Sequence, residues 1–327
     1  MKSIASAPGK IILFGEHFVV HGTKAILAAI DKRVEVTSTF TEKEGIKINS
    51  NFMWGGGLGS IEVPISSSYE EVKSEFRPFV YLVNKMVNSN QNVSGLEITI
   101  DSGIPVGVGL GSSSACCVAA TASISGLFKE LSSEEILKIS IEAEKTIFPD
   151  TSGADCTVCT YGGMIEYDKI KGIEKIDSTS DLLIVIWDSG IQHSTKRTVE
   201  RVNKFKENNE ERFSQLCALE NKLIDEVKLA MKNNDLDTIG LKMSENQQML
   251  EEINVSNTEI RNIISALNKI WFGSKITGAG DGGCVIALAN RKSYDTQQEQ
   301  MMRHMLLGDF FPANIDTKGV VWSKIEE

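Results

Sequence analysis

The sequence predicts an α+β protein of two domains, and three features lead to this expectation. The chain has 327 residues, which is more than a single hydrophobic core usually organises. Its first half mixes segments with strand and helix periodicity. Its second half has the order β-α-α-β-β-α-β, which fits the ferredoxin-like plan with an extra helix. We expect the boundary near residue 180, in the polar stretch DSTSD, which gives domains of residues 1–180 and 181–327.

The first hundred residues are expected to form strands and one helix. Apolar or alternating runs predict strands at residues 11–14, 25–30, 33–40, 45–49, 61–65 and 95–100. Residues 70–90 carry apolar side chains at helical spacing, which predicts a helix. The glycine cluster at 55–60 is followed by no capped helix, so we expect a loop there.

Two further helices are expected before the domain boundary. An Ala/Ser-rich run follows the glycine-rich segment Pro105–Ala115. The next helix covers 131–145, with Ser132 or Ser133 as its N-cap and two glutamates in the first turn. The second domain then follows, with strands at 182–187, 275–277, 284–289 and 319–325 and helices at 195–232, 235–270 and near 293–307.

Composition limits the class of protein. The hydrophobic fraction of 41% is that of an ordinary globular chain. A formal net charge of −10 argues against a nucleic acid or an anionic membrane as the main partner. No apolar run approaches the ~20 residues that span a bilayer, and the N-terminus is a poor secretory signal. We therefore expect a cytoplasmic protein with no membrane partner.

Six cysteines are present, and two of them, Cys156 and Cys159, form a C-x-x-C pair. Such a pair is compatible with a redox motif or half of a zinc site. A zinc site needs two further ligands, and the chain has only four histidines and no second C-x-x-C. We interpret these cysteines as small buried apolar side chains.

The segment PVGVGLGSSSA, Pro105–Ala115, is the most informative one. Gly107, Gly109 and Gly111 allow positive φ and a close approach of the backbone to a ligand. The serines that follow open a helix, whose N-terminal N–H groups and dipole attract anions. The segment matches neither a P-loop nor a dinucleotide-binding fingerprint. By itself it is also compatible with a tight strand-to-helix corner.

The segment APGKIILFGEHFVVHG, Ala7–Gly22, carries a lysine at an unusual place. Pro8-Gly9 is expected to turn the chain and to deliver Lys10 at the start of an apolar strand. A lysine there is typical of an anionic partner, although a snorkelling surface lysine is the alternative. Glu16, His17 and His21 then concentrate polar groups between apolar runs.

Two carboxylates and a further glycine cluster complete the candidate site. Glu144 lies near the end of a predicted helix. The turn Thr151-Ser152-Gly153 is expected to present Asp155 near the edge of a new strand. Phosphoryl transfer needs one carboxylate for a metal ion and one for the proton of the nucleophile. The cluster TGAGDGG, Thr277–Gly283, is a second flexible cradle between two strands.

Together these motifs resemble the GHMP kinase superfamily over essentially the whole chain. The resemblance implies an N-terminal domain like domain 2 of ribosomal protein S5 and a ferredoxin-like C-terminal domain. Lys10 stands where galactokinases carry arginine, and homoserine kinases lack the G-E-H element. The first motif is therefore most similar to that of the branch that phosphorylates mevalonate. ATP, Mg²⁺ and (R)-mevalonate are the implied ligands, the C5 hydroxyl is the implied acceptor, and a homodimer is suggested.

The resemblance also implies a role for each matching residue. Asp155 matches the catalytic base and Lys10 the group that polarises the reacting oxygen. Ser113 and Glu144 match the Mg²⁺ ligands. The nucleotide-binding positions are Ser102, Pro105, Val106, Gly107, Val108, Gly109, Leu110, Gly111, Ser112, Ser113 and Ser114. The substrate-side positions are Glu16, His17, Thr195, Gly278 and Ala279.

Two departures from the superfamily pattern do not remove a group that the chemistry needs. Asp281 stands where glycine is usual, and it is expected to point away or to contact metal or substrate. Thr151 replaces a common proline, which should loosen the turn slightly. A related kinase acting on phosphomevalonate, a sugar or another mevalonate hydroxyl is the alternative enzyme. A non-catalytic metabolite-binding regulator is the alternative outside enzymes, and it would be expected to lose Lys10, Glu144 or Asp155.

Overall fold

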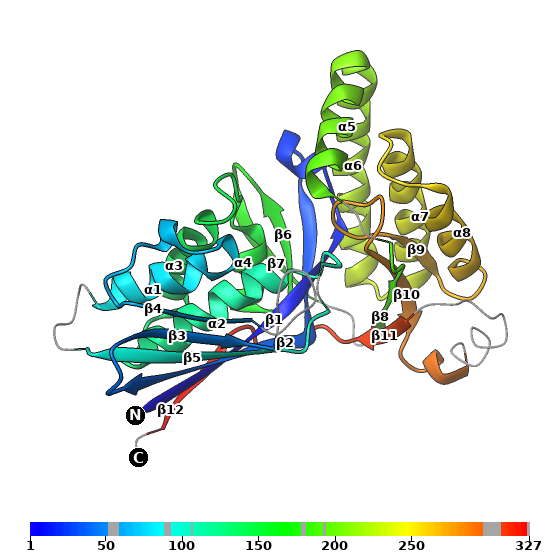
Figure 1. Ribbon diagram of the computed structural model, residues 1–327. Helices are drawn as coiled ribbons and strands as arrows, with labels where there is room; N and C mark the ends of the chain where they lie inside the picture. The colour runs from blue at the N-terminus through cyan, green and yellow to red at the C-terminus, as the bar shows by residue number, and fades with distance from the viewer. Residues whose placement is uncertain are drawn as a thin grey trace.

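The computed structural model describes residues 1–51, 59–87, 93–105, 107–177, 181–191, 194–296 and 309–325. Two sheets, each with helices packed on it, organise this part of the chain (Figure 1). Among the described residues, no helix combines the length and the apolar composition needed to cross a membrane.

The first sheet has eight strands among the described residues, in the order β12-β1-β2-β5-β3-β4, with β6 pairing to β2 and β7. These strands are β1 (Lys2–Phe14), β2 (Ala25–Thr41), β3 (Gly45–Ser50), β4 (Gly59–Val63), β5 (Gly95–Ser102), β6 (Met164–Asp168), β7 (Gly172–Ile176) and β12 (Val321–Ile325). All pairs are antiparallel except β3 with β5.

Four helices cover the inner face of this sheet (Figure 1). They are α1 (Arg77–Val87), α2 (Ser112–Gly126), α3 (Ser133–Lys145) and α4 (Ala154–Tyr161). Helix α2 packs on β1 and β2, and α1, α3 and α4 pack around it. The small side chains of α2 allow a close approach: a Cβ on Gly126 would lie 2.4 Å from the Ser3 hydroxyl oxygen. The C-terminal end of α2 is thereby packed against the start of β1. The loop before α2 is joined to the same strand by the N–H of Lys10, which donates to the Leu110 carbonyl.

The second sheet has the order β11-β8-β10-β9, and all of its pairs are antiparallel. Its strands are β8 (Leu182–Asp188), β9 (Gly273–Ile276), β10 (Cys284–Asn290) and β11 (Asp309–Ala313). The helices of this part are α5 (Thr195–Asn208), α6 (Glu210–Lys232), α7 (Leu236–Glu252) and α8 (Thr258–Leu267). Numbered along the chain, the strands lie in the order 4-1-3-2, so the predicted ferredoxin-like plan is confirmed.

Several element boundaries differ from the predictions. The expected helix at 70–90 is α1, preceded by two 3₁₀ turns, η2 (Tyr69–Glu71) and η3 (Ser74–Phe76). Each of the two long helices expected in the second domain is divided into two. Ser132 is the N-cap of α3 and forms a capping box with Glu135, as one of the two predicted alternatives. Most of the loop at 55–60, most of the helix near 293–307 and the boundary stretch at 178–180 fall outside the described residues.

The placement of the last strand in the second domain is wrong. Strand β12 pairs with β1 in the first sheet, from Lys2 opposite Ile325 to Ser6 opposite Val321. The fourth strand of the second sheet is β11 instead. A run of alternating residues predicts that a strand forms but not which partner it joins, and here the chain returns to its own beginning.

The expected turn at Pro8-Gly9 is also wrong. Both residues lie inside β1, where the pairing register with β2 shifts between Pro8 and Gly9. A bulge of this kind re-aims the following side chain without ending the strand. Lys10 therefore sits within β1 rather than at its start.

An ion pair between Arg33 and Asp316 fixes the return of the chain to the first sheet. Arg33 Nη1 donates to Asp316 Oδ2, and Asp316 Oδ1 accepts from the N–H groups of Lys318 at 2.9 Å and Gly319 at 3.1 Å. Only 8% of the Asp316 side chain is exposed. The pair is therefore mostly withdrawn from water.

We predict that Asp316→Ala lowers the free energy of unfolding by about 2–4 kcal/mol, because it removes the carboxylate that balances a partly buried guanidinium and the side-chain acceptor of two N–H groups. Glu62→Ala, which breaks the exposed pair with Lys43, should change it by only about 0.5 kcal/mol. Urea unfolding followed by circular dichroism measures both values. Equal losses in the two variants would contradict this role of Asp316.

Candidate active site

Three segments that are far apart in the sequence meet between the two sheets: β1, the glycine-rich loop 107–111, and the loop 277–283, here called the third loop. A Cβ on Gly109 would lie 3.8 Å from the carbonyl oxygen of Thr277, and one on Gly278 would lie 3.8 Å from that of Gly109. The Thr277 hydroxyl accepts from the N–H of Ile12 at 3.0 Å and donates to its carbonyl at 2.9 Å. The two glycine-rich loops therefore lie against each other beside β1.

Lys10 and Asp155 form an ion pair at this meeting point. The distance from Lys10 Nζ to Asp155 Oδ2 is 3.0 Å, and the two side chains are 6% and 35% exposed. The N–H of Lys10 also donates to the Leu110 carbonyl at 2.9 Å, which joins the strand to the glycine-rich loop. The ammonium group is thus buried beside one carboxylate that solvent can still reach, and the alternative of a snorkelling surface lysine is wrong.

Gly111 packs directly on the Lys10 side chain. Gly111 has φ of 72° and is the N-cap of α2. A Cβ there would lie 2.5 Å from Lys10 Cγ, far inside the contact distance, so only glycine fits beside the lysine. The glycine therefore keeps the N-terminus of a 15-residue helix next to the ammonium group.

Asp155 lies in the first turn of α4, not at the edge of a strand as expected. The sequence ADCTVCTY has weak helix propensity, and burial of its Cys, Thr and Val side chains overrides that preference. Gly153, with φ of 78°, is the N-cap of this helix. A carboxylate in the first turn is stabilised by the helix dipole.

Glu144, at the end of α3, is buried close to Asp155. Its Oε1 accepts from the Ser114 hydroxyl and its Oε2 accepts from the Thr151 hydroxyl at 2.6 Å. Burial, and then the negative charge of Asp155, raise the pKa of Glu144, while the two hydroxyl groups lower it. Thr151, which stands where the superfamily often has proline, therefore connects the turn to Glu144 through its hydroxyl group.

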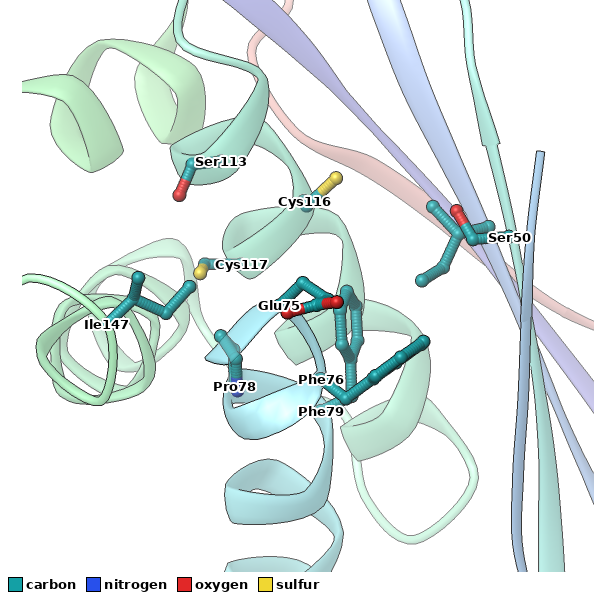
Figure 2. A pocket seen from close by; sticks show the side chains of 10 residues that line it. Ser50, Glu75, Phe76, Pro78, Phe79, Ser113, Cys116, Cys117 and Ile147 are labelled. Atoms are coloured by element: carbon teal, nitrogen blue, oxygen red, sulfur yellow. The ribbon is translucent and has the colours of Figure 1, made fainter. Parts of the chain in front are cut away.

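Ser113 lies at the edge of a pocket beside the glycine-rich loop (Figure 2). The pocket is narrow, with a volume of about 20 Å³ that suits little more than a water molecule, and its walls carry Phe76, Phe79, Cys116 and Cys117. The Ser113 hydroxyl oxygen is buried and has no hydrogen-bond partner among the described residues. This serine is thus free to contact a bound group, whereas Ser114 is already held by Glu144.

His17 is bound to the third loop. It has an unusual φ of 57°, and its Nε2 lies 2.8 Å from the carbonyl oxygen of Ala279. Because the Ala279 carbonyl can only accept, Nε2 carries the proton. Burial lowers the pKa of the His17 imidazole, so the ring is favoured in its neutral form.

Glu16, by contrast, does not reach the surface of the cleft. Its side chain is fully buried and forms an ion pair with Lys275. The predicted direct contact between Glu16 and substrate is therefore not available in this structure. The motif that contains Glu16 gave no indication of its partner, which lies 259 residues away.

The remaining predicted residues keep their roles as predictions. Thr195 is exposed at the first position of α5, and Ser194 caps that helix. Ser102 ends β5, and its hydroxyl accepts from the N–H of Ile104 at 3.2 Å. The loop and helix positions Pro105, Gly107, Val108, Gly109, Leu110, Gly111, Ser112 and Ser114 are described, whereas Val106 lies outside the described residues.

Asp281 points away from the glycine-rich loop of α2. Its carboxylate accepts from Arg201 Nη2 on α5, and its backbone has φ of 62°, which favours glycine. The N–H of Asp281 donates to the Val255 carbonyl at 2.8 Å. This aspartate therefore connects the third loop to α5, one of the outcomes that the sequence left open.

The C-x-x-C pair is buried in α4. Burial raises the pKa values of the Cys156 and Cys159 thiols well above the ordinary value of a cysteine, and the nearby carboxylates raise them further. Both thiols therefore stay protonated and behave as small apolar side chains, as predicted.

This arrangement defines a class of small-molecule kinase. The family model described as GHMP kinases N terminal domain matches residues 78–163, and the model described as GHMP kinases C terminal matches residues 227–305. A glycine-rich loop at the start of a helix, a buried lysine and two carboxylates suit phosphoryl transfer, which depends on positioning and charge neutralisation. Fold and site together are those of a GHMP kinase.

Relatives that match most of the chain show to which family within this class the chain belongs. The mevalonate kinase of Thermococcus onnurineus is 37% identical over 306 residues, which cover 89% of this chain and 90% of that protein. The mevalonate kinase of Aeropyrum pernix is 30% identical and covers 99% and 98% of the two chains. The crystal structure of Methanococcus jannaschii mevalonate kinase superposes with a TM-score of 0.82 at 28% identity, over 95% of this chain and 98% of that one. The chain belongs to the mevalonate kinase family.

We predict that Gly111→Ala lowers kcat/KM for phosphoryl transfer by about 100-fold, because the new methyl group displaces Lys10 from Asp155. Gly163→Ala is the matched control: its φ of 73° is nearly the same, but a Cβ there meets no atom within 4 Å. Both variants should lose about 1 kcal/mol of stability from the left-handed backbone. Gly111→Ala should lose more than this, because its methyl group also displaces the buried Lys10. Similar activity in the two variants would contradict the close contact with Lys10.

Proposed function

We propose that this protein transfers the γ-phosphoryl group of ATP to the C5 hydroxyl of (R)-mevalonate, an early step of isoprenoid biosynthesis. The observation that carries the proposal is the 3.0 Å ion pair between Lys10 and Asp155 beside the glycine-rich loop at the start of α2. An amine and a carboxylate at that separation can both contact one hydroxyl oxygen. Location in the cytoplasm and assembly as a homodimer stay predictions.

The phosphate groups of ATP are proposed to lie against the segment 107–114. The backbone of this segment turns through three glycines with positive φ and leads into the N-terminus of α2. Unpaired N–H groups and the helix dipole favour an anion at that position.

The residues near the loop fit a Mg²⁺ ion. Ser113 provides a buried hydroxyl oxygen without a partner among the described residues, and Glu144 provides a carboxylate. Hard oxygen ligands of this kind, completed by phosphate and water, are what Mg²⁺ prefers. When bound, the ion would neutralise charge on the phosphate groups. We therefore keep Ser113 and Glu144 as the proposed ligands.

The acceptor is proposed to lie between His17 and the third loop, with Thr195, Gly278 and Ala279 around it. A mevalonate kinase of L. major, whose structure was determined in complex with R-mevalonate, has the same fold, with a TM-score of 0.77. The relatives named mevalonate kinase support this choice of acceptor over a sugar or an amino acid.

Different side chains of the protein are proposed to perform the separate tasks of the phosphoryl transfer. Asp155 accepts the proton of the attacking hydroxyl group as the oxygen–phosphorus bond forms. Lys10 stabilises the negative charge that develops on the oxygen and on the transferred group. Neutral His17 and the loop that it holds orient the acceptor, and burial of Lys10 keeps the amine in one position.

We predict that Asp155→Asn lowers kcat by about 10²–10⁴-fold, since the amide cannot accept the proton. Asp150→Asn is the control, because Asp150 is an exposed aspartate in the same connection and should retain full activity. Release of ADP with (R)-mevalonate measures the rate, and ³¹P NMR identifies the product. Wild-type kcat in Asp155→Asn would exclude the role of base.

The acceptor itself is tested with four compounds: (R)-mevalonate, phosphomevalonate, galactose and homoserine. We expect ADP release that depends on mevalonate, with the phosphate on the C5 oxygen. Activity confined to one of the other three acceptors would contradict the proposed function while leaving the kinase class intact.

A further inference from the structure

A cluster of charged side chains is fully buried behind the candidate site. Lys275 of β9 and Glu16, which follows β1, form an ion pair in which both side chains are 0% exposed. Lys275 Nζ also donates to the carbonyl of Ile276 at 2.7 Å. Burying two charges carries a large desolvation penalty, so the pair is retained at a cost in stability.

A second carboxylate faces the same lysine. Glu220 of α6 is buried, and its Oε2 accepts from Asn246 Nδ2 of α7 at 2.6 Å. Burial first, and then the negative charge of Glu16, raise the pKa of Glu220 to about 7, while Lys275 and Asn246 lower it. The charged and titratable groups that act on Glu220 are thus Glu16 and Lys275, together with the amide of Asn246 and the backbone of Gly15.

The cluster has more acceptors than donors. Three of its buried oxygens, Glu16 Oε2, Glu220 Oε1 and Asn246 Oδ1, have no hydrogen-bond donor among the described residues. Buried acceptors of this kind usually find a donor. A proton on one of the two carboxyl groups would supply the missing donor, and it would also leave a single carboxylate to balance the single ammonium group.

Each partner of the ion pair is joined to a loop of the candidate site. Glu16 immediately precedes His17, whose ring is bound to the carbonyl of Ala279. Lys275 lies two residues before Thr277, whose hydroxyl is bound to the backbone of Ile12 in β1. Movement of the ion pair would therefore shift the residues that follow β1, including His17, together with the third loop.

We propose that Glu16, Lys275 and Glu220 form a buried positioning cluster, in which the two carboxyl groups share one proton and so hold His17 against the third loop. The effect on catalysis rests on the proposed function, whereas the shared proton does not. None of the three side chains touches the reacting groups, so each is a positioning residue and not a catalytic one.

Loss of the shared proton should loosen the cluster. When Glu220 ionises, two carboxylates compete for Lys275 and repel each other in a poorly solvated place. A buried acid whose pKa is raised from 4.5 to about 7 favours the folded state most below pH 4.5. This contribution of Glu220 to stability falls as the pH rises from 4.5 to about 7, and it does not change further at higher pH.

The experiment compares the wild type with Glu220→Gln between pH 5 and pH 8.5, using the full chain. The amide imitates the protonated acid and cannot ionise. We expect the Tm of the wild type to fall by at least about 3 °C relative to that of Glu220→Gln as the pH rises from 5 to 7.5. We also expect KM for mevalonate to rise about three- to tenfold in the wild type only, with kcat little changed.

A second readout does not depend on activity. The chain has four histidines, so ¹⁵N-labelled histidine gives few signals, and His17→Gln assigns the Nε2–H signal of His17. This signal should shift with a midpoint near pH 7 in the wild type and stay constant in Glu220→Gln. Glu16→Gln removes the other carboxylate and should abolish the same pH dependence, which also tests the proposal if Glu220→Gln fails to fold.

Glu211→Gln, an exposed glutamate of α6, is the matched control and should follow the wild type. Glu220→Gln with the pH dependence of the wild type in Tm would overturn the shared proton. A difference in Tm without any difference in the His17 signal would overturn the positioning role. If no variant phosphorylates mevalonate, the proposed function fails, and the Tm and NMR results still decide the cluster.

Discussion

The site depends on the burial of one ammonium group beside one carboxylate. Lys10 is almost completely removed from water, and an unpaired lysine there would be strongly destabilising. Asp155 balances the charge from the first turn of α4, and Gly111 leaves room for the aliphatic part of the lysine. Strand β1, the loop before α2 and helix α4 are therefore fixed relative to one another by the same contact.

The contacts that join the two sheets are made by residues of the candidate site and their direct neighbours. The backbone of β1 binds Thr277 of the third loop, and the residues after β1 supply Glu16 to Lys275 and His17 to Ala279. The chain also returns to the first sheet as β12 after completing the second sheet (Figure 1). Movement between the two parts would consequently change the substrate side of the cleft, while the contact between Lys10 and Asp155 lies within the first part.

The sequence indicated residues that the structure brings together, but it did not indicate the buried contacts that connect them to the rest of the fold. Lys10, Glu144 and Asp155 were found because their motifs place unusual polar residues next to glycine turns and apolar runs. Lys275 and Glu220 were missed, since a lysine in a strand and a glutamate in a helix leave no local signal of burial when their partners are remote. Helix α4 and the pairing of β12 were mispredicted for the same reason: tertiary packing overrides local propensity and chooses the partner strand.

The most direct test of the central claim is a crystal structure with mevalonate, Mg²⁺ and a non-hydrolysable ATP analogue bound together. It would measure the distances from the acceptor hydroxyl oxygen to Lys10 Nζ and to Asp155 Oδ2. We expect both to be about 2.6–3.2 Å, with the terminal phosphate in line with the hydroxyl. A bound acceptor whose hydroxyl approaches the phosphate but lies beyond the reach of Asp155 would contradict the account.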